Sequence, residues 1–87
     1  MAEALYLKVI NRNGIVYQGR VAAVSSRNQK GTFDVVDMHT NFITLLDAPL
    51  KILLPDGNAL EVAAENGVMK VFNNKISVYL GIKSGLR

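Results

Sequence analysis

Apolar and polar residues alternate along most of the chain with a period of two, which is typical of strands that have one buried face. The segments LYLKVIN and KISVYL show this alternation most clearly. Their positions predicted to be buried are Leu5, Leu7, Val9, Ile76, Val78 and Leu80. No window of the sequence carries the stripe of period 3.6 that an amphipathic helix needs. The pattern therefore predicts a protein built of strands.

Turn-forming residues interrupt the alternation at intervals of about seven to ten residues. The pair Asn13-Gly14 is typical of a type I′ hairpin turn, in which both central residues take positive φ. Residues 55–57 (PDG) and 73–74 (NN) predict two further turns, and Gly19 predicts a bulge or a kink. About nine short strands separated by such turns are typical of an all-β sandwich or barrel.

Three segments in the middle of the chain have predicted orientations of their own. In TFDVV, Phe33 and Val35 are predicted to point inward. Residues 41–46 (NFITLL) form a nearly continuous apolar run, which predicts a strand covered on both faces. In ALEVAA, the positions predicted to be buried are Leu60, Val62 and Ala64.

Length and composition exclude several classes of protein. Eighty-seven residues predict a single domain over residues 1–87. There is no cysteine, so disulfide frameworks and cysteine-based zinc sites are excluded. No apolar run approaches the roughly 18 residues of a membrane span, and the first ten residues lack the pattern of a signal peptide. We therefore expect a soluble, cytoplasmic protein.

The net charge of +3 is distributed unevenly. Residues 1–30 carry five basic groups against one acid, residues 31–65 carry one basic group against six acids, and residues 66–87 carry four basic groups and no acid. No segment packs its basic residues into a dense run, so a nucleic-acid patch would have to be assembled by the fold.

The residues that could perform chemistry do not form a catalytic pattern. His39 is the only histidine, and a metal site there would have only carboxylates as partners. Asp34 and Asp37 differ by three positions, so on a regular strand they point to opposite faces. Ser25 and Ser26 have no histidine–acid pair beside them. The sequence predicts no enzyme, no cofactor and no metal, and His39 is interpreted as a structural or interface residue.

Exposed aromatic and aliphatic side chains predict a surface for a partner. A thin sandwich cannot cover all its strands itself, and apolar groups left outside favour docking. The positions expected to do this are Tyr6, Ile10, Val36, Phe72 and Tyr79. Stacking on single-stranded nucleic acid is the alternative use of the tyrosines, which are Tyr6, Tyr17 and Tyr79.

Short motifs along residues 5–80 occur in the order and near the spacing of one known family. The matching positions are Val16, Tyr17, Gly19, Val21, Gly31, Phe33, Val35, His39, Ile43, Thr44, Gly67, Val71, Asn74, Ile76, Val78 and Leu80. With this ordered set the sequence resembles the N-terminal domain of the epsilon subunit of rotary ATP synthases, the subunit called delta in mitochondria.

The resemblance implies a flattened antiparallel β-sandwich of about nine to ten short strands. It implies a non-catalytic central-stalk subunit that docks on the gamma subunit and the c-ring, so that ion-driven rotation is coupled to ATP synthesis. Candidates for the c-ring side are Lys30, Thr32, Met38 and His39. Candidates for the gamma side are Asn11 and Thr44. The implied location is the cytoplasmic face of the inner membrane of a bacterium, peripheral to it, with no small-molecule substrate and no nucleic acid.

The chain departs from the family's usual residues around His39 and the preceding turn. The substituted positions are Asp34, Asp37, Met38, Thr40 and Asn41, which stand where the family usually has glycine, proline or alanine. Thr32 replaces a frequent acidic residue, and Lys30 adds a cation nearby, so the usual charge pairing with the ring is changed. The two-helix hairpin that usually follows this domain is not included in the sequence, so roles that depend on it, in ATP binding and in braking rotation, are not expected.

A small barrel-like module that binds single-stranded nucleic acid through its basic terminal segments is the alternative function. Salt separates the two predictions, because nucleic-acid binding weakens steeply with salt. Docking on gamma by apolar burial should survive moderate salt.

Overall fold

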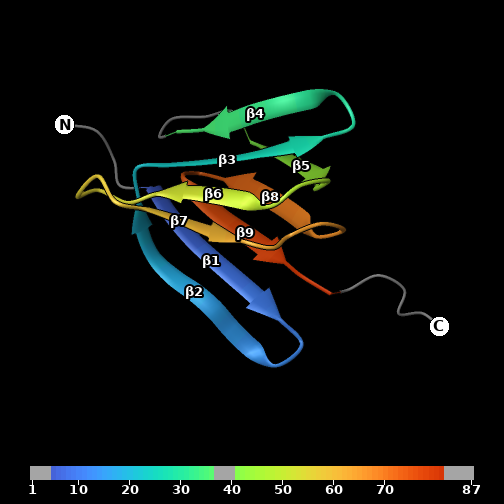
Figure 1. Cartoon of the computed structure of the whole chain (residues 1–87), viewed down its shortest axis with the longest axis horizontal. Coiled ribbons are helices and arrows are strands. Elements are labelled where there is room, and N and C mark those ends of the chain that lie inside the picture. Colours follow the sequence, from blue (N-terminus) through green and yellow to red (C-terminus); the bar gives the residue numbers. More distant parts are fainter. Residues whose placement is uncertain (1–4, 37–40, 82–87) are drawn as a thin grey trace.

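The computed structural model of the chain describes residues 5–36 and 41–81, which form nine strands and no helix (Figure 1). The strands are β1 (Leu5–Asn11), β2 (Gly14–Val21), β3 (Ala23–Asn28), β4 (Gly31–Val35), β5 (Phe42–Leu45), β6 (Leu50–Leu53), β7 (Ala59–Val62), β8 (Val68–Phe72) and β9 (Lys75–Tyr79). The all-β class and the number of strands expected from the alternation are confirmed.

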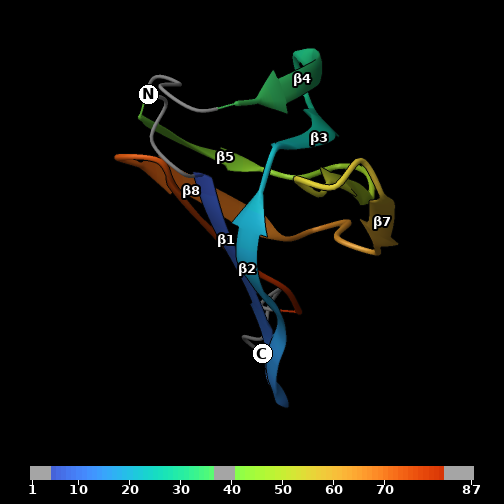
Figure 2. The same ribbon diagram turned by 90° about the vertical axis from the view of Figure 1, so that its left-hand side faces the viewer.

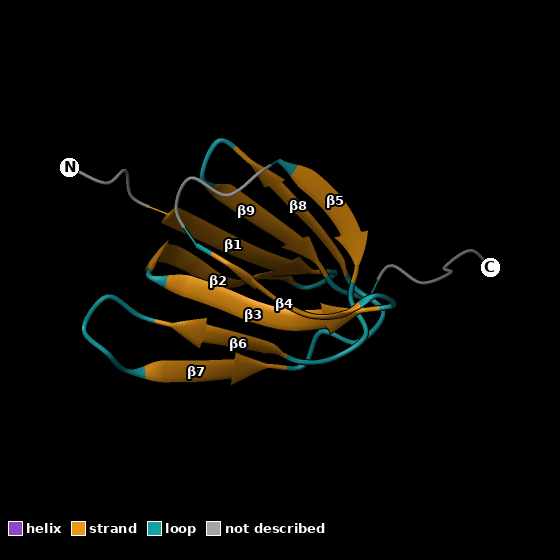
Figure 3. Ribbon diagram, turned by 90° about the horizontal axis from the view of Figure 1, so that it is seen from above, coloured by secondary structure: helices purple, strands orange, loops and turns teal. Residues whose placement is uncertain are grey.

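The strands form two sheets that pack as a sandwich. The five-stranded sheet has the order β2-β1-β9-β8-β5, and the four-stranded sheet has the order β4-β3-β6-β7. Every neighbouring pair is antiparallel except β1 and β9, which run parallel. Figures 2 and 3 show the two layers, and Figure 2 shows the β1–β2 hairpin projecting beyond the other strands. The molecule is flattened, with extents of 46 × 27 × 20 Å.

The core lies between the two sheets and is built from alternate residues of the strands. Leu7 lies opposite Ile76, and Val9 lies opposite Val78, on the parallel pair β1 and β9, and all four are buried. The buried apolar side chains are Leu5, Leu7, Val9, Val21, Val24, Val35, Leu46, Leu50, Ile52, Ala64, Met69, Val71, Ile76 and Val78. Phe33, Val62 and Leu80 pack against them, half-buried. The inward positions predicted in LYLKVIN, TFDVV and KISVYL are confirmed.

The β1–β2 turn differs from the predicted type I′ turn. Arg12 and Asn13 form the turn, Asn11 pairs with Gly14, and of these residues only Gly14 takes positive φ, at 129°. The Asn13 N–H donates to the Asn11 side-chain oxygen at 2.8 Å, which fixes the turn one residue earlier than the Asn-Gly rule predicts. Type I′ was therefore wrong for this pair.

The irregularity in β2 also lies away from the predicted position. The register shifts between Val9 and Ile10, opposite Val16, and not at Gly19. Gly19 leaves room for the side chain of Tyr17, because a Cβ atom there would lie 3.3 Å from the Tyr17 hydroxyl oxygen. Gly19 therefore allows the Tyr17 side chain to approach the backbone closely, and it is not the site of the bulge.

Two other predicted turns are confirmed. Asn73 and Asn74 join β8 to β9 with φ of 51° and 64°, as a type I′ turn requires. Asparagine tolerates this region better than other non-glycine residues. In the PDG turn, Gly57 has φ of 95° and donates its N–H to the Leu54 carbonyl at 3.0 Å.

β5 is an edge strand and not a doubly covered one. It pairs only with β8 in the five-stranded sheet, and Ile43 and Leu45 are 68% and 63% exposed. The prediction that residues 41–46 are covered on both faces was wrong. A continuous apolar run is found in buried central strands, but an edge strand that meets a partner can carry the same run. Leu60 on β7, also at a sheet edge, is exposed as well, contrary to prediction, whereas Ala64 is buried.

Candidate functional site

Half of the side chains of the five-stranded sheet point away from the core and form one broad surface. We call this surface the outer face of the five-stranded sheet. Its residues are Tyr6, Lys8, Ile10, Ile15, Gln18, Arg20, Ile43, Leu45, Val68, Lys70, Phe72, Lys75, Ser77 and Tyr79. They share one side because directly opposite residues of paired strands point the same way while their chain neighbours are buried.

Large apolar side chains are concentrated on this outer face. Ile43 and Leu45 at the β5 edge are the most exposed. Tyr6, Phe72 and Tyr79 on the three central strands β1, β8 and β9 are also exposed. Exposed apolar groups of this size, gathered on one face, are typical of a surface that another molecule covers. Two of the five positions predicted to be exposed differ from these. Ile10 lies on the outer face but is half-buried. Val36 is exposed, but it follows β4 of the other sheet.

The same outer face carries four cations and no carboxylate. The cations are Lys8, Arg20, Lys70 and Lys75. They come from both ends of the chain, and the pairing of β1 with β9 brings those ends together. The fold thus assembles a basic surface from segments that carry no dense basic run.

The outer face of the four-stranded sheet balances its charges internally. Asp34 accepts a hydrogen bond from the Ser25 hydroxyl on the neighbouring strand. Lys51 on β6 lies directly opposite Glu61 on β7. The two faces of the sandwich therefore differ in charge, and only the five-stranded sheet presents cations without acids beside them.

A hollow of about 250 Å³ lies on the outer face across β2, β1 and β9. Its outward lining residues are Tyr6, Lys8, Gln18, Lys75 and Ser77. Beside it, the Arg20 guanidinium lies 5.9 Å from the centre of the Tyr6 ring, and its Nε donates to the Tyr6 hydroxyl at 3.5 Å. This hydrogen bond raises the pKa of Arg20, which is a cation with or without it. The hollow combines ammonium, amide and hydroxyl donors with an aromatic wall.

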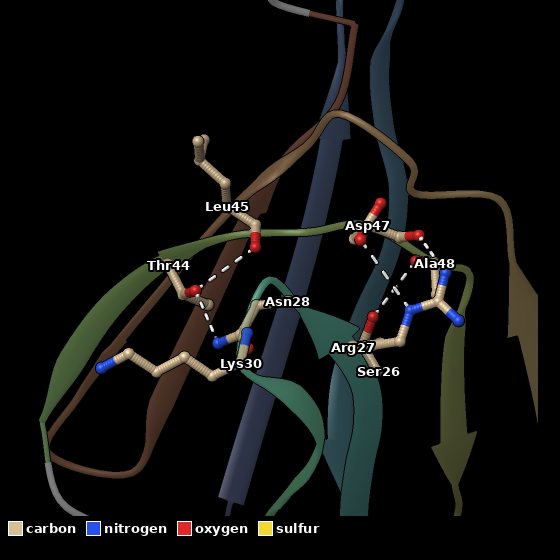
Figure 4. A network of polar contacts seen from close by, with 8 residues as sticks. All are labelled: Ser26, Arg27, Asn28, Lys30, Thr44, Leu45, Asp47 and Ala48. Carbon is tan, nitrogen blue, oxygen red and sulfur yellow. Dashed lines mark hydrogen bonds and ion pairs between the residues drawn. The ribbon is translucent and has the colours of Figure 1, made fainter.

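Lys30 lies in the β3–β4 turn, where the Asn28 side chain reaches Thr44 of the other sheet (Figure 4), and Thr32 follows in β4. The Asn28 side-chain amide donates to the Thr44 hydroxyl at 2.9 Å, and Thr44 donates in turn to the Leu45 carbonyl at 3.3 Å. Lys30 donates its backbone N–H to the Asn28 side-chain oxygen at 2.8 Å. Lys30 and Thr44, predicted for two different partners, thus line one hollow of about 450 Å³.

A second set of contacts fixes the segment between β5 and β6 to β3 (Figure 4). The Asp47 N–H donates to the Arg27 carbonyl at 2.8 Å, and the Arg27 guanidinium donates to the Asp47 carbonyl at 3.1 Å. Their charged side chains lie 3.9 Å apart. Because both are exposed, this ion pair contributes little by itself. The Ser26 hydroxyl, which is buried, donates to the Ala48 carbonyl at 3.1 Å.

The other predicted site residues lie apart from this turn. Asn11 lies at the end of β1 and orders the β1–β2 turn, with β9 and β8 between its strand and the strand of Thr44. Met38 and His39 fall in residues 37–40, outside the described residues. The described residues on either side of them are Val36, after β4, and Asn41, before β5.

The basic residues of the outer face are absent from the predicted site residues. Lys8, Lys70 and Lys75 each occupy a polar position of an alternating strand, and each has a buried apolar residue directly beside it in the chain. That local signal marks an exposed position but gives no strand order. Only the pairing of β9 with both β1 and β8 shows that the three lysines share one surface.

Residues 5–36 and 41–81 contain no group of three histidine, aspartate or glutamate side chains placed to hold a metal ion. Nor does this part of the chain form a helix long and apolar enough to cross a membrane.

Similar sequences come from bacterial ATP synthases. The ATP synthase epsilon chain of Sulfurimonas denitrificans is 31% identical over 75 residues, which cover 85% of this chain and 58% of the relative. That of Sulfurovum sp. is 28% identical over 74 residues, covering 84% and 58%. The chain thus spans less than two thirds of the length of these relatives.

Two solved structures share the fold. A chain of the Euglena gracilis mitochondrial ATP synthase (OSCP/F1/c-ring) superposes with a TM-score of 0.81 at 18% identity, covering 88% of this chain and 50% of that chain. A chain of the Tetrahymena thermophila mitochondrial ATP synthase central stalk/c-ring superposes with a TM-score of 0.68 at 10% identity, covering 90% and 63%.

A family profile matches the chain as well. The profile described as ATP synthase, delta/epsilon chain, β-sandwich domain matches residues 4–80. This match covers nearly the whole sequence and agrees with the order of motifs found in it. The chain therefore belongs to the family of the β-sandwich domain of the ATP synthase delta/epsilon chain.

Proposed function

We propose that the chain is a non-catalytic part of the central stalk of a rotary ATP synthase, where it docks on the gamma subunit and the c-ring. In this role it helps to couple ion-driven rotation to ATP synthesis. The family match over residues 4–80 supports the assignment to the complex. The fold shared with chains of two mitochondrial ATP synthases supports it too. The chain needs no cofactor and no small-molecule substrate for this role.

The gamma subunit docks on the outer face of the five-stranded sheet. The observation that carries this assignment is the exposure of Ile43 and Leu45 at the β5 edge, beside Phe72 and Tyr79. Apolar side chains removed from water on association supply about 25 cal/mol per Å². The unpaired edge of β5 lies next to the same groups, and a partner would cover it. Asn11 and Thr44 lie at the border of this contact.

The c-ring contacts the end of the sandwich that carries the β3–β4 turn. Lys30 and Thr32 are exposed there, and the Asn28 side chain, which also bonds Thr44, fixes the backbone of Lys30. Met38 and His39 complete the predicted ring-facing set. With Thr32 in place of an acidic residue and with the added cation of Lys30, the matching loops of the ring carry acidic or neutral groups. The chain is accordingly peripheral to the membrane, on the cytoplasmic face in a bacterium.

Titration of the chain against the gamma subunit of the same organism tests this function. Replacing Ile43 and Leu45 together with serine should raise the Kd by about tenfold or more, because fully burying a leucine or isoleucine side chain contributes about 1.5–3 kcal/mol. Leu53→Ser is the matched control, since Leu53 is an exposed leucine on the other sheet. Equal binding by the double variant and the control would contradict docking through this face.

A second candidate is a module that binds single-stranded nucleic acid. Tyr6, Phe72 and Tyr79 share the outer face with four cations, and bases stack on such aromatic groups beside a basic surface. A labelled oligonucleotide of roughly 15 nucleotides tests it directly. Salt-sensitive retention of the oligonucleotide, with no binding of gamma, would favour this second function.

A further inference from the structure

We infer that the hollow across β2, β1 and β9 receives a carboxylate side chain of the protein surface that docks there. The inference rests on the proposed docking of the gamma subunit and names the chemistry of the contact. The hollow measures about 250 Å³, which suits the end of one side chain.

Cross-strand pairing places the donors of the hollow around one point. Lys8 on β1 lies opposite Gln18 on β2 and Ser77 on β9. Lys75 lies opposite Tyr6, one row further along the same strands. Two ammonium groups, an amide and a hydroxyl therefore line the same hollow. A carboxylate accepts several hydrogen bonds at once, and charge-assisted bonds of this kind are about twice as strong as neutral ones.

The charges around the hollow are balanced by nothing on its own face. No acid occurs among the outward residues of the five-stranded sheet, and the single ion pair of the described residues joins Arg27 to Asp47 elsewhere. The four-stranded sheet, in contrast, sets Lys51 opposite Glu61. Like charges gathered without partners repel one another, so a partner that brings carboxylates is favoured over one that does not.

The surroundings of the hollow favour a protein carboxylate over a nucleic-acid phosphate. The cations nearest the hollow are Lys8, Arg20 and Lys75, which form one patch over β1, β2 and β9, with Tyr6 on the same face of the same strands. Tyrosine and arginine, which this patch supplies as Tyr6 and Arg20, are among the residues enriched in protein–protein hot spots. A nucleic-acid groove instead tracks a backbone with cations along its length.

Tyr6 gives the hollow a fixed wall. Its hydroxyl accepts a hydrogen bond from Arg20, whose guanidinium lies over the ring. Arg20 therefore acts as a positioning residue, and its charge adds to the attraction of an anion arriving at Lys8 and Lys75. Apolar burial alone would make docking on gamma insensitive to moderate salt. The four cations of the outer face add an electrostatic contribution to the binding free energy, and salt weakens that contribution.

The test compares charge-neutral variants in a titration with the gamma subunit at low and moderate salt. Lys8→Gln and Lys75→Gln combined should raise the Kd by at least about tenfold, because hydrogen bonds to charged groups contribute enough for one to two orders of magnitude. The slope of log Kd against log salt should become shallower. Lys51→Gln is the control, an exposed lysine on the other sheet, and should bind as the unaltered chain does. Thermal unfolding verifies that each variant is folded.

The outcomes separate this inference from the proposed function. If the lysine double variant binds gamma unchanged while the Ile43 and Leu45 double variant binds weakly, the carboxylate contact is wrong and docking stands. If the unaltered chain binds no gamma at either salt, docking itself fails and the contact with it. If the lysines are needed only to retain a labelled oligonucleotide, the hollow binds phosphate, and the inference is overturned.

Discussion

Asn28 on β3 donates its side-chain amide to the hydroxyl of Thr44 on β5 across 2.9 Å, and this bond joins the two sheets of the sandwich at one edge. The bond fixes the turn that presents Lys30, because the same Asn28 side chain accepts the backbone N–H of Lys30. One asparagine thus connects the proposed ring-facing turn to the strand whose outer side faces gamma in our proposal.

Asn28→Ala should therefore destabilise the domain by about 1–2 kcal/mol, since two hydrogen bonds of ordinary strength are lost. Urea unfolding measures the change. Gln29→Ala is the control, because Gln29 is exposed in the same turn and should change the free energy of unfolding by less than about 0.5 kcal/mol. Equal stability of the two variants would mean that the bridge between the sheets contributes nothing.

A second prediction concerns Gly67, which is buried in the loop before β8. A Cβ atom there would lie 3.0 Å from the Ala64 carbonyl oxygen and 3.1 Å from the Tyr79 carbonyl oxygen. Backbone atoms cannot move aside easily, so Gly67→Ala should cost about 1–3 kcal/mol. Thermal unfolding should show the loss, whereas Glu65→Ala, at an exposed position nearby, should leave the midpoint almost unchanged. A Gly67→Ala variant as stable as the unaltered chain contradicts this packing.

One substitution made at two isoleucines separates core from docking surface. Ile52 is fully buried and Ile43 is exposed. Ile52→Val should lower the free energy of unfolding by about 0.5–1.5 kcal/mol, because it leaves a small cavity. Ile43→Val should change it by less than about 0.5 kcal/mol. Chemical unfolding of both variants checks the assignment, and a larger loss at Ile43 would place that residue in the core instead.

The β8–β9 turn gives a prediction about backbone conformation. Asn73 has φ of 51°, where most side chains are strained. Asn73→Ala should cost about 1 kcal/mol, and Asn73→Gly should cost less because glycine takes this conformation freely. Urea unfolding of the alanine and glycine variants measures the two changes in the free energy of unfolding. The turn would not have the described conformation if alanine were tolerated better than glycine.

Local patterns predicted much of this fold. Alternation identified the buried face of β1, and the pair Asn73-Asn74 identified a hairpin turn, since both signals act within a few residues. The apolar run of β5 was misread because a strand's place at a sheet edge depends on pairing with β8, which lies more than twenty residues away. The Asn13-Gly14 turn was misread because the side chain of Asn11 competes for the Asn13 N–H.

The candidate site was less predictable from sequence. Thr44 is a motif position of the family and Lys30 precedes another, Gly31, but nothing local shows that Lys30 and Thr44 share a hollow. Lys8 and Lys75 stand 67 positions apart and become neighbours only because β1 pairs with β9. A basic surface assembled in this way is invisible to any search for a run of charges.

Site-specific cross-linking within the assembled ATP synthase tests the central claim most directly. The chain has no cysteine, so a single introduced thiol can carry a photoreactive maleimide at a chosen position. Leu45→Cys, on the outer face of the five-stranded sheet, should give a cross-linked product with the gamma subunit. Leu53→Cys, on the outer face of the other sheet, should give none. The reverse pattern, with gamma captured from position 53 and not from position 45, would contradict the account.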